Sequence, residues 1–390
     1  MVEGPVTLNV PASFLQGHNN TQFVLTPQAA QLLSDRGRIL FQKKIEQGVE
    51  LADLDRVVIH VALFARKKII DLQYQDFFID QESRLLIDVI KSELHGCLNS
   101  VVERLQEKIE QGLQGWGVDR VLHTAPHHDD IMLGYYSMIV RFPKTDHHMM
   151  IVVSGSNGVS DEYLYDFLKQ NKQEFALVNL YEKHGNFGKN RLATLMKMEI
   201  REKEEELLWK RSGMKCGMTH LRSPFYNASY FKSQPTFDND VSPCVALIDK
   251  LSPGLILVLN DSELQGPNTH HASFKIVMDA IKACGKRIKV LGYRNVWDRY
   301  RIDEASVIFP ISQKEYDEQH ELFIECFTSQ KKALYPSKNG AEPFSVYAQQ
   351  IQKNQYQELV VLLGKNYFDN HKDQRMRSAV GVVLFEEVKS

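Results

Sequence analysis

After residue 118 the chain alternates short apolar segments with amphipathic ones, and this alternation decides the fold class. Most of the apolar segments are rich in β-branched residues, as buried strands are. They are Val121–Ala125, Met149–Val153, Leu255–Leu259, Ile288–Leu291 and Val307–Ile311. Apolar residues at helical spacing lie around residues 134–141, 191–212, 271–284 and 313–332. The pattern predicts an α/β fold with a Rossmann-like, largely parallel sheet flanked by helices.

The first part of the chain has a different period. Apolar residues there recur at a spacing of three to four, most clearly from Leu94 through Leu98, Val101 and Leu105 to Ile109. This is the spacing of a helix with one apolar face. We therefore expect a helical amino-terminal region over residues 1–117 and an α/β domain over residues 118–390. The sequence leaves the role of the first region open between a lid, an oligomerisation module and a partner surface.

Charge and cysteine content narrow the function classes. Lys plus Arg number 47 and Asp plus Glu number 49, so no basic excess favours a nucleic-acid partner. No apolar run reaches the roughly 20 residues that span a bilayer, and no basic stretch precedes an apolar block as in a secretory signal. The five cysteines are scattered, which favours a reducing compartment. We expect a cytoplasmic protein without a membrane span.

Two imidazoles and two carboxylates stand together where the first strand of the predicted sheet ends, in His127-His128-Asp129-Asp130. Such a cluster is costly to bury unless a cation compensates it, and His with carboxylate ligands is a common hydrolytic zinc arrangement. His127 and Asp130 can reach one ion from a turn that enters a helix, which leaves Asp129 for proton transfer. The alternative is that Asp129 and Asp130 only cap the next helix.

A second polar cluster follows the strand Leu255–Leu259. It consists of Asn260-Asp261 and, a few residues later, His270-His271 at the start of a helix. Ligand sites in parallel sheets lie beyond the carboxyl ends of the strands, so this loop can lie beside the first cluster. On these residues alone, either histidine can be the third ligand.

These residues resemble the signature of the PIG-L/LmbE-like zinc N-deacetylases. The resemblance rests on Ala125-Pro126-His127-x-Asp129-Asp130-x-x-Leu133-Gly134, on the segment from His270 to Ala280, and on Arg201-x-x-Glu204. Over roughly residues 118–370 the chain is most similar to the deacetylase-like half of two-domain, glucosamine-6-phosphate-deaminase-like bacterial proteins.

The resemblance implies a site and a reaction. It implies Zn²⁺ as the cofactor, His127, Asp130 and His270 as its ligands with His271 as the second choice, and Asp129 as the general base. The implied reaction hydrolyses the acetamide of an N-acetylglucosamine-type substrate to acetate and a free amine. The expected partner is thus a small amino sugar, and a homo-oligomer is left open.

Two positions depart from that family pattern. His128 stands where the family has Pro, and Pro267 stands where it often has a His thought to help stabilise the oxyanion. These departures motivate a competing function, a non-catalytic sugar- or nucleotide-binding protein with a degenerate deacetylase site. Hydrolysis of another amide, such as that of a thiol–sugar conjugate, is a third possible function.

Substrate contacts are expected from two further strand ends. Asn157 lies in Ser154–Gly158, which follows the second strand and offers amide and hydroxyl groups. Tyr293 and Arg294 follow Ile288–Leu291, and a guanidinium suits a phosphate or hydroxyl group. The alternative for this pair is a packed aromatic ring beside a surface arginine. Asp146-His147-His148 precedes its strand, so we expect it at the opposite edge of the sheet.

Overall fold

The computed structural model describes residues 6–8, 10–18, 33–227, 234–261, 267–331 and 342–389. Two compact units make up the chain. The first contains Met1–Leu105 and Val361–Gly364, and the second contains Gln106–Val360 and Lys365–Ser390.

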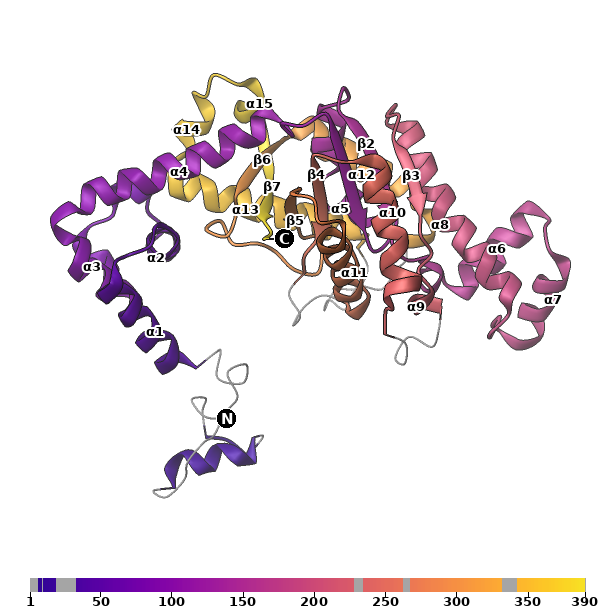
Figure 1. Ribbon diagram of the computed structural model, residues 1–390, viewed down its shortest axis with the longest axis horizontal. Helices are drawn as coiled ribbons and strands as arrows, with labels where there is room; N and C mark the ends of the chain where they lie inside the picture. Colours follow the sequence, from indigo (N-terminus) through magenta and orange to yellow (C-terminus); the bar gives the residue numbers. More distant parts are fainter. Residues whose placement is uncertain are drawn as a thin grey trace. The chain divides into compact units, whose positions relative to one another are not determined.

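A seven-stranded sheet forms the centre of the second unit (Figure 1). Its strands are β1 (Arg120–Ala125), β2 (Asp146–Ile151), β3 (Gly217–His220), β4 (Leu255–Leu259), β5 (Lys289–Tyr293), β6 (Val307–Ser312) and β7 (Ala379–Glu387). Their order across the sheet is β3-β2-β1-β4-β5-β7-β6. The five strands from β3 to β5 pair in parallel, and β7 runs antiparallel to both of its neighbours. The predicted, largely parallel α/β sheet is confirmed.

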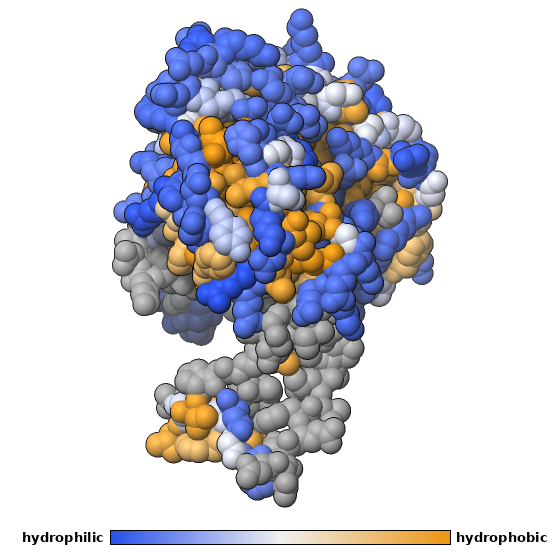
Figure 2. All heavy atoms as spheres, turned by 90° about the vertical axis from the view of Figure 1, so that its left-hand side faces the viewer, coloured by the Kyte–Doolittle hydropathy of each residue, from blue (hydrophilic) through white to orange (hydrophobic). Residues whose placement is uncertain are grey.

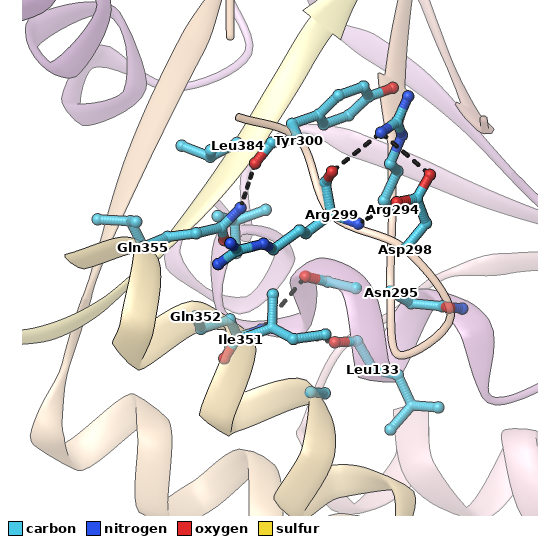
Figure 3. A pocket seen from close by; sticks show the side chains of 14 residues that line it. Leu133, Arg294, Asn295, Asp298, Arg299, Tyr300, Ile351, Gln352, Gln355 and Leu384 are labelled. Atoms are coloured by element: carbon cyan, nitrogen blue, oxygen red, sulfur yellow. Dashed lines mark hydrogen bonds and ion pairs between the residues drawn. The ribbon is translucent and has the colours of Figure 1, made fainter. Parts of the chain in front are cut away.

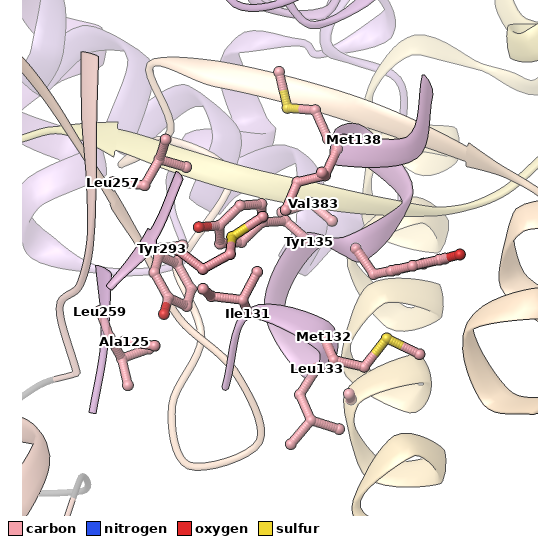
Figure 4. Packing of buried hydrophobic residues seen from close by; sticks show 14 of the residues in the cluster. Ala125, Ile131, Met132, Leu133, Tyr135, Met138, Leu257, Leu259, Tyr293 and Val383 are labelled. Atoms are coloured by element: carbon pink, nitrogen blue, oxygen red, sulfur yellow. The ribbon is translucent and has the colours of Figure 1, made fainter. Parts of the chain in front are cut away.

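Helices cover both faces of this sheet (Figure 1). The helices that begin in the second unit are α5 (Asp130–Arg141), α6 (Asp161–Asn171), α7 (Phe175–His184), α8 (Arg191–Arg211), α9 (Pro224–Asn227), α10 (Ser242–Leu251), α11 (Asn268–Cys284), α12 (Gln313–Cys326), α13 (Phe344–Leu363), α14 (Lys365–Asp369) and α15 (Gln374–Arg377), of which α6 and α7 pack beside α8 rather than on the sheet. Because side chains alternate along a strand, β4 sends Leu257 to one face and Ile256 to the other. Leu257 packs in a cluster with residues of α5, α8 and α12, part of which is drawn in Figure 4. Ile256 packs in another cluster with residues of α10 and α11.

The first unit is helical, as predicted. It contains α1 (Ser34–Gln47), α2 (Leu51–Ala65), α3 (Gln81–Ile90) and the first half of α4 (Leu94–Gln114). Buried apolar residues such as Val58 and Leu86 form its interior, while Leu51 and Phe64 remain exposed. Figure 2 shows one face of the molecule, on which patches of apolar side chains lie among polar ones.

The sheet fixes where the polar clusters lie. Since β1, β4 and β5 are adjacent and parallel, their carboxyl ends meet at one edge. Asp146 begins β2, so Asp146-His147-His148 lies toward the opposite edge, as expected. Within the described residues, every helix is too short or too polar to cross a bilayer.

Candidate metal and active site

The turn after β1 presents the first cluster. The backbone N–H of His127 donates to Oδ2 of Asp130 over 2.7 Å, which closes the turn before α5 begins. Asp129 is the N-cap residue of α5, but its side chain makes no capping hydrogen bond. The capping alternative therefore does not describe Asp129.

Three ligand atoms from two loops converge at this turn. Nδ1 of His127 lies 3.3 Å from Oδ2 of Asp130 and 3.3 Å from Nε2 of His270. The Asp130 and His270 atoms are 3.8 Å apart. The structure thus brings together His127, Asp130 and His270, the three residues that the sequence put forward as ligands, and His270 rather than His271 is in the group.

A second set of side chains orients two of these ligands. Oδ2 of Asp261 lies 2.6 Å from Nδ1 of His270, so Nδ1 is the donor and Nε2 turns its lone pair toward the cluster. The Asn295 amide donates to Oδ1 of Asp130 over 2.8 Å. Sequence reasoning assigned no role to Asp261 or Asn295, because loop residues that act through another side chain carry no spacing signal.

Burial and charge act in opposite directions on the ligands. Burial tends to raise the pKa of Asp130, but His270 and His127 outweigh it and hold that pKa at about 2. Burial tends to lower the pKa of His270, but Asp130 and Asp261 outweigh it and raise that pKa. Asp130 therefore stays ionised, as a cation ligand must be.

Asp129 is held by a buried arginine from α8. Nη2 of Arg201 donates to Oδ1 of Asp129 over 2.6 Å, and Nη1 donates to Glu204 over 3.0 Å. Glu204 in turn accepts hydrogen bonds from the backbone and hydroxyl of Ser329, at 2.6 and 2.8 Å. Burial favours a neutral Arg201, but Asp129 and Glu204 outweigh it and raise the arginine's pKa. Asp129 thus has a fixed orientation and a permanent counter-charge.

A cavity of about 420 Å³ opens onto this cluster. Asp129, the three converging residues and Arg201 form one part of its lining. Neutral polar and aromatic side chains form much of the rest, including Asn157, Ser160, Gln330 and Trp297. Its volume is within the range of small-molecule sites. Asn157 therefore lies where substrate contact was expected.

Tyr293 and Arg294 lie outside that lining. The Tyr293 side chain is fully buried, and its hydroxyl donates to the Thr124 carbonyl over 3.0 Å. The Arg294 guanidinium donates to the carbonyls of Asn260 and Arg299 and pairs with Asp298 at 3.1 Å (Figure 3). The space beside it measures about 20 Å³, enough for about one water. These contacts give both side chains a packing role, which was the stated alternative to substrate binding.

Comparison with known proteins gives one curated relative. It is a protein of Bacteroides thetaiotaomicron described as glucosamine-6-phosphate deaminase-like, 22% identical over 364 residues. The match covers 80% of this chain and 53% of the relative, so the chain spans about half the relative's length. It confirms the resemblance to glucosamine-6-phosphate-deaminase-like bacterial proteins. No protein-family model matches the chain.

Two of the solved structures that match this chain are enzymes whose activities differ from each other. A 4-carboxy-2-hydroxymuconate hydratase from Pseudomonas putida is 11% identical, with a TM-score of 0.45 over 70% of this chain and 97% of its own. The N,N'-diacetylchitobiose deacetylase of Pyrococcus horikoshii is 12% identical, with a TM-score of 0.46 over 75% of this chain and 92% of its own. With TM-scores below 0.5, neither neighbour decides what this chain does.

Proposed function

We propose that residues 118–390 form a zinc-dependent N-deacetylase domain. It hydrolyses the acetamide of an N-acetylglucosamine-type substrate to acetate and a free amine. The observation that carries this proposal is the convergence of His127, Asp130 and His270 beside Asp129 in the lining of one cavity.

The donor set and its geometry fit zinc. Tetrahedral Zn²⁺ with nitrogen and oxygen ligands at about 2.0–2.1 Å places those ligands about 3.3 Å apart. The three observed separations are 3.3, 3.3 and 3.8 Å. His127, Asp130 and His270 would hold the ion, and the Asp261 and Asn295 contacts orient the last two. When bound, zinc supplies a Lewis acid for the amide carbonyl and the attacking water.

Asp129 provides the proton transfers. Because Oδ1 accepts the hydrogen bond from Arg201, Oδ2 is the oxygen that takes a proton from the attacking water. Arg201 holds the carboxylate in the orientation that this step needs. The same carboxyl group, or a second acid, then returns a proton to the leaving amine.

The remaining wall suits a sugar. Asn157, Ser160 and Gln330 offer amide and hydroxyl groups for the hydroxyls of a pyranose, and Trp297 offers an aromatic face. The five unpaired cysteines favour a reducing compartment, so we propose a cytoplasmic enzyme.

Acetate release from N-acetylglucosamine and N,N'-diacetylchitobiose tests the proposal. We expect Asp129→Asn to lower kcat by about 10²–10⁴-fold while its zinc content is kept. Asp146→Asn is the matched control, because Asp146 also pairs with an arginine but lies toward the opposite edge of the sheet. Undiminished acetate release from Asp129→Asn would exclude Asp129 as the base.

One observation favours the competing function. Pro267 lines the cavity three residues before His270, at the position where the family that this chain resembles often has a His thought to help stabilise the oxyanion. A protein that only binds sugars would show calorimetric binding at saturating zinc and no acetate after long incubation. Acetate release at any steady rate excludes it.

A further inference from the structure

His128 lies between His127 and Asp129 in the sequence, but its side chain is not part of the group formed by His127, Asp130 and His270. Its residue is 1% exposed, and within the described part of the chain neither ring nitrogen has a hydrogen-bond partner. A buried imidazole without partners costs roughly 1–3 kcal/mol, so each such group in a folded protein calls for an explanation. An apolar residue or a proline at this position would avoid that free-energy cost.

Two possible ligands surround His128. They are Glu205 on α8 and His220 at the end of β3. The rings of His128 and His220 lie 5.1 Å apart, and Nε2 of His220 lies 2.8 Å from Oε2 of Glu205. One nitrogen or carboxylate oxygen of each residue lies within 4.8 Å of the other two.

The surrounding charge favours a cation. Glu205 is fully buried, and Glu202 brings a second carboxylate to 3.8 Å from Nδ1 of His220. Arg222 offsets Glu202 with two hydrogen bonds of 2.6 Å. The nearby charge of Arg201 is taken up by Asp129 and Glu204. The Glu205 carboxylate pairs with His220 through Oε2, and its Oε1 accepts a hydrogen bond from Nε1 of Trp209 over 3.4 Å.

We propose that His128, Glu205 and His220 form a second divalent-cation site, separate from the one at His127, Asp130 and His270. Two imidazoles and a carboxylate are a donor set that suits zinc or a related transition-metal ion. One pair of these ligand atoms lies 2.8 Å apart and all three lie within 4.8 Å of one another, so small side-chain adjustments would bring them around an ion. The ion would thus connect the turn after β1, which carries His128, to the end of β3, which carries His220.

The site acts on the turn that carries the candidate catalytic residues. His128 is covalently joined to His127 and Asp129, and α8 carries both Glu205 and the Arg201 that holds Asp129. An ion on His128 and Glu205 therefore fixes the turn relative to the helix that orients the base. The two ligand sets share no residue, so each can be emptied separately.

Zinc stoichiometry of the full chain tests this proposal. After equilibrium dialysis against Zn²⁺, elemental analysis should find two zinc ions per chain in the wild type and one in His220→Ala. His371→Ala is the matched control, because His371 also pairs with a glutamate, Glu110, at 2.9 Å but belongs to neither set. It should keep two.

A wild type that binds one ion, lost in His270→Ala and kept in His220→Ala, overturns the second site and leaves the deacetylase proposal intact. One ion lost in His220→Ala and kept in His270→Ala supports the second site and overturns the first. Should His220→Ala fail to fold, the wild-type stoichiometry and the milder Glu205→Gln decide. The cobalt-substituted wild type gives a further measurement, since two occupied sites should show more visible absorption at saturation than the single site left in His270→Ala.

Discussion

Asp129 and Arg201 form an ion pair that connects the candidate base to a distant part of the chain. Both side chains are nearly inaccessible to solvent. Arg201 also binds Glu204, which is held by Ser329 just after α12. The orientation of one carboxylate at the site thus depends on a residue two hundred positions away.

Replacing Arg201 by Met should damage both activity and stability. The substitution leaves Asp129 and Glu204 buried without their counter-charge, and breaking such a pair costs about 3–5 kcal/mol. We expect kcat to fall while KM changes little, because the base is misoriented and the sugar contacts remain. Urea denaturation and acetate release measure the two effects.

Arg211→Met provides the control for that experiment. Arg211 lies at the end of the same helix and pairs with Glu325 at 3.5 Å, but both side chains are more than half exposed. Its loss should therefore change the free energy of unfolding by at most about 1 kcal/mol. Equal effects of the two substitutions would refute a special role for Arg201.

At the residue scale, the sequence picked out the side chains that converge at the candidate site and missed those that position them. His127, Asp130 and His270 stand at strand ends, where topology alone makes them converge. Asp261 and Asn295 act through another side chain, which needs three-dimensional contact to see. For Arg294 the strand-end rule placed the residue at the right edge, but the guanidinium turns into its own loop.

Helix α5 approaches β5 closely enough that one position has room only for a hydrogen. A Cβ on Gly134 would lie 2.7 Å from Cδ2 of Tyr293. Tyr293 cannot move freely, since its hydroxyl holds the Thr124 carbonyl in β1. The glycine thus sets the distance between the helix that begins at Asp130 and the sheet.

Gly134→Ala should lower the free energy of unfolding by about 1–3 kcal/mol, the usual cost of overpacking a core. Gly96→Ala is its control, because no heavy atom lies within 4 Å of a Cβ built at this position in α4. There alanine should leave stability unchanged or raise it by up to about 1 kcal/mol. Chemical denaturation of both variants gives the comparison, and a Gly134→Ala as stable as wild type would show that α5 and Tyr293 separate easily.

At the element scale, local pattern located four of the five strands that pair in parallel, and β6, but left out β3 and β7. The strand β4 has the predicted bounds, and α5 begins at Asp130, four residues earlier than its periodicity indicated. β7 enters the sheet between β5 and β6, with Val307 opposite Phe385. Pairing across so long a stretch of chain is set by tertiary contacts that no local period records.

A buried chain of hydrogen bonds joins the neighbouring strands β1 and β2 to α5. Nε2 of His147 lies 3.0 Å from the Phe142 carbonyl, so it is the donor, and Nδ1 accepts. Nδ1 of His147 then accepts from Nε2 of His123 over 2.8 Å, and Nδ1 of His123 accepts from the Tyr135 hydroxyl over 3.1 Å. Every bond in the chain is satisfied only while both imidazoles are neutral.

At the scale of the whole molecule, the sequence did not place the boundary between the two units where the contacts place it. The change of period near residue 118 marks where the strands begin, but the contacts assign Gln106–Gln114 of α4 to the second unit and Val361–Gly364 to the first. A helix that passes from one unit to the next has a continuous apolar period on both sides. Periodicity therefore cannot mark such a boundary.

The buried histidines make the stability of the second unit depend on pH. Burial lowers the pKa of His123 well below its usual value, and burial also lowers that of His147. At these two positions the unfolded chain binds protons near pH 6.5 that the folded chain does not, so their contribution to stability is full above pH 6.5 and falls as the pH drops below it. Urea denaturation at pH 7.5, 6.5 and 5.5 should show a loss of about 1 kcal/mol or more over the last step. His123→Phe should be less stable at pH 7.5 yet lose less on acidification, whereas exposed His184→Phe keeps the wild-type slope. Equal slopes in all three proteins would mean that the chain tolerates a proton.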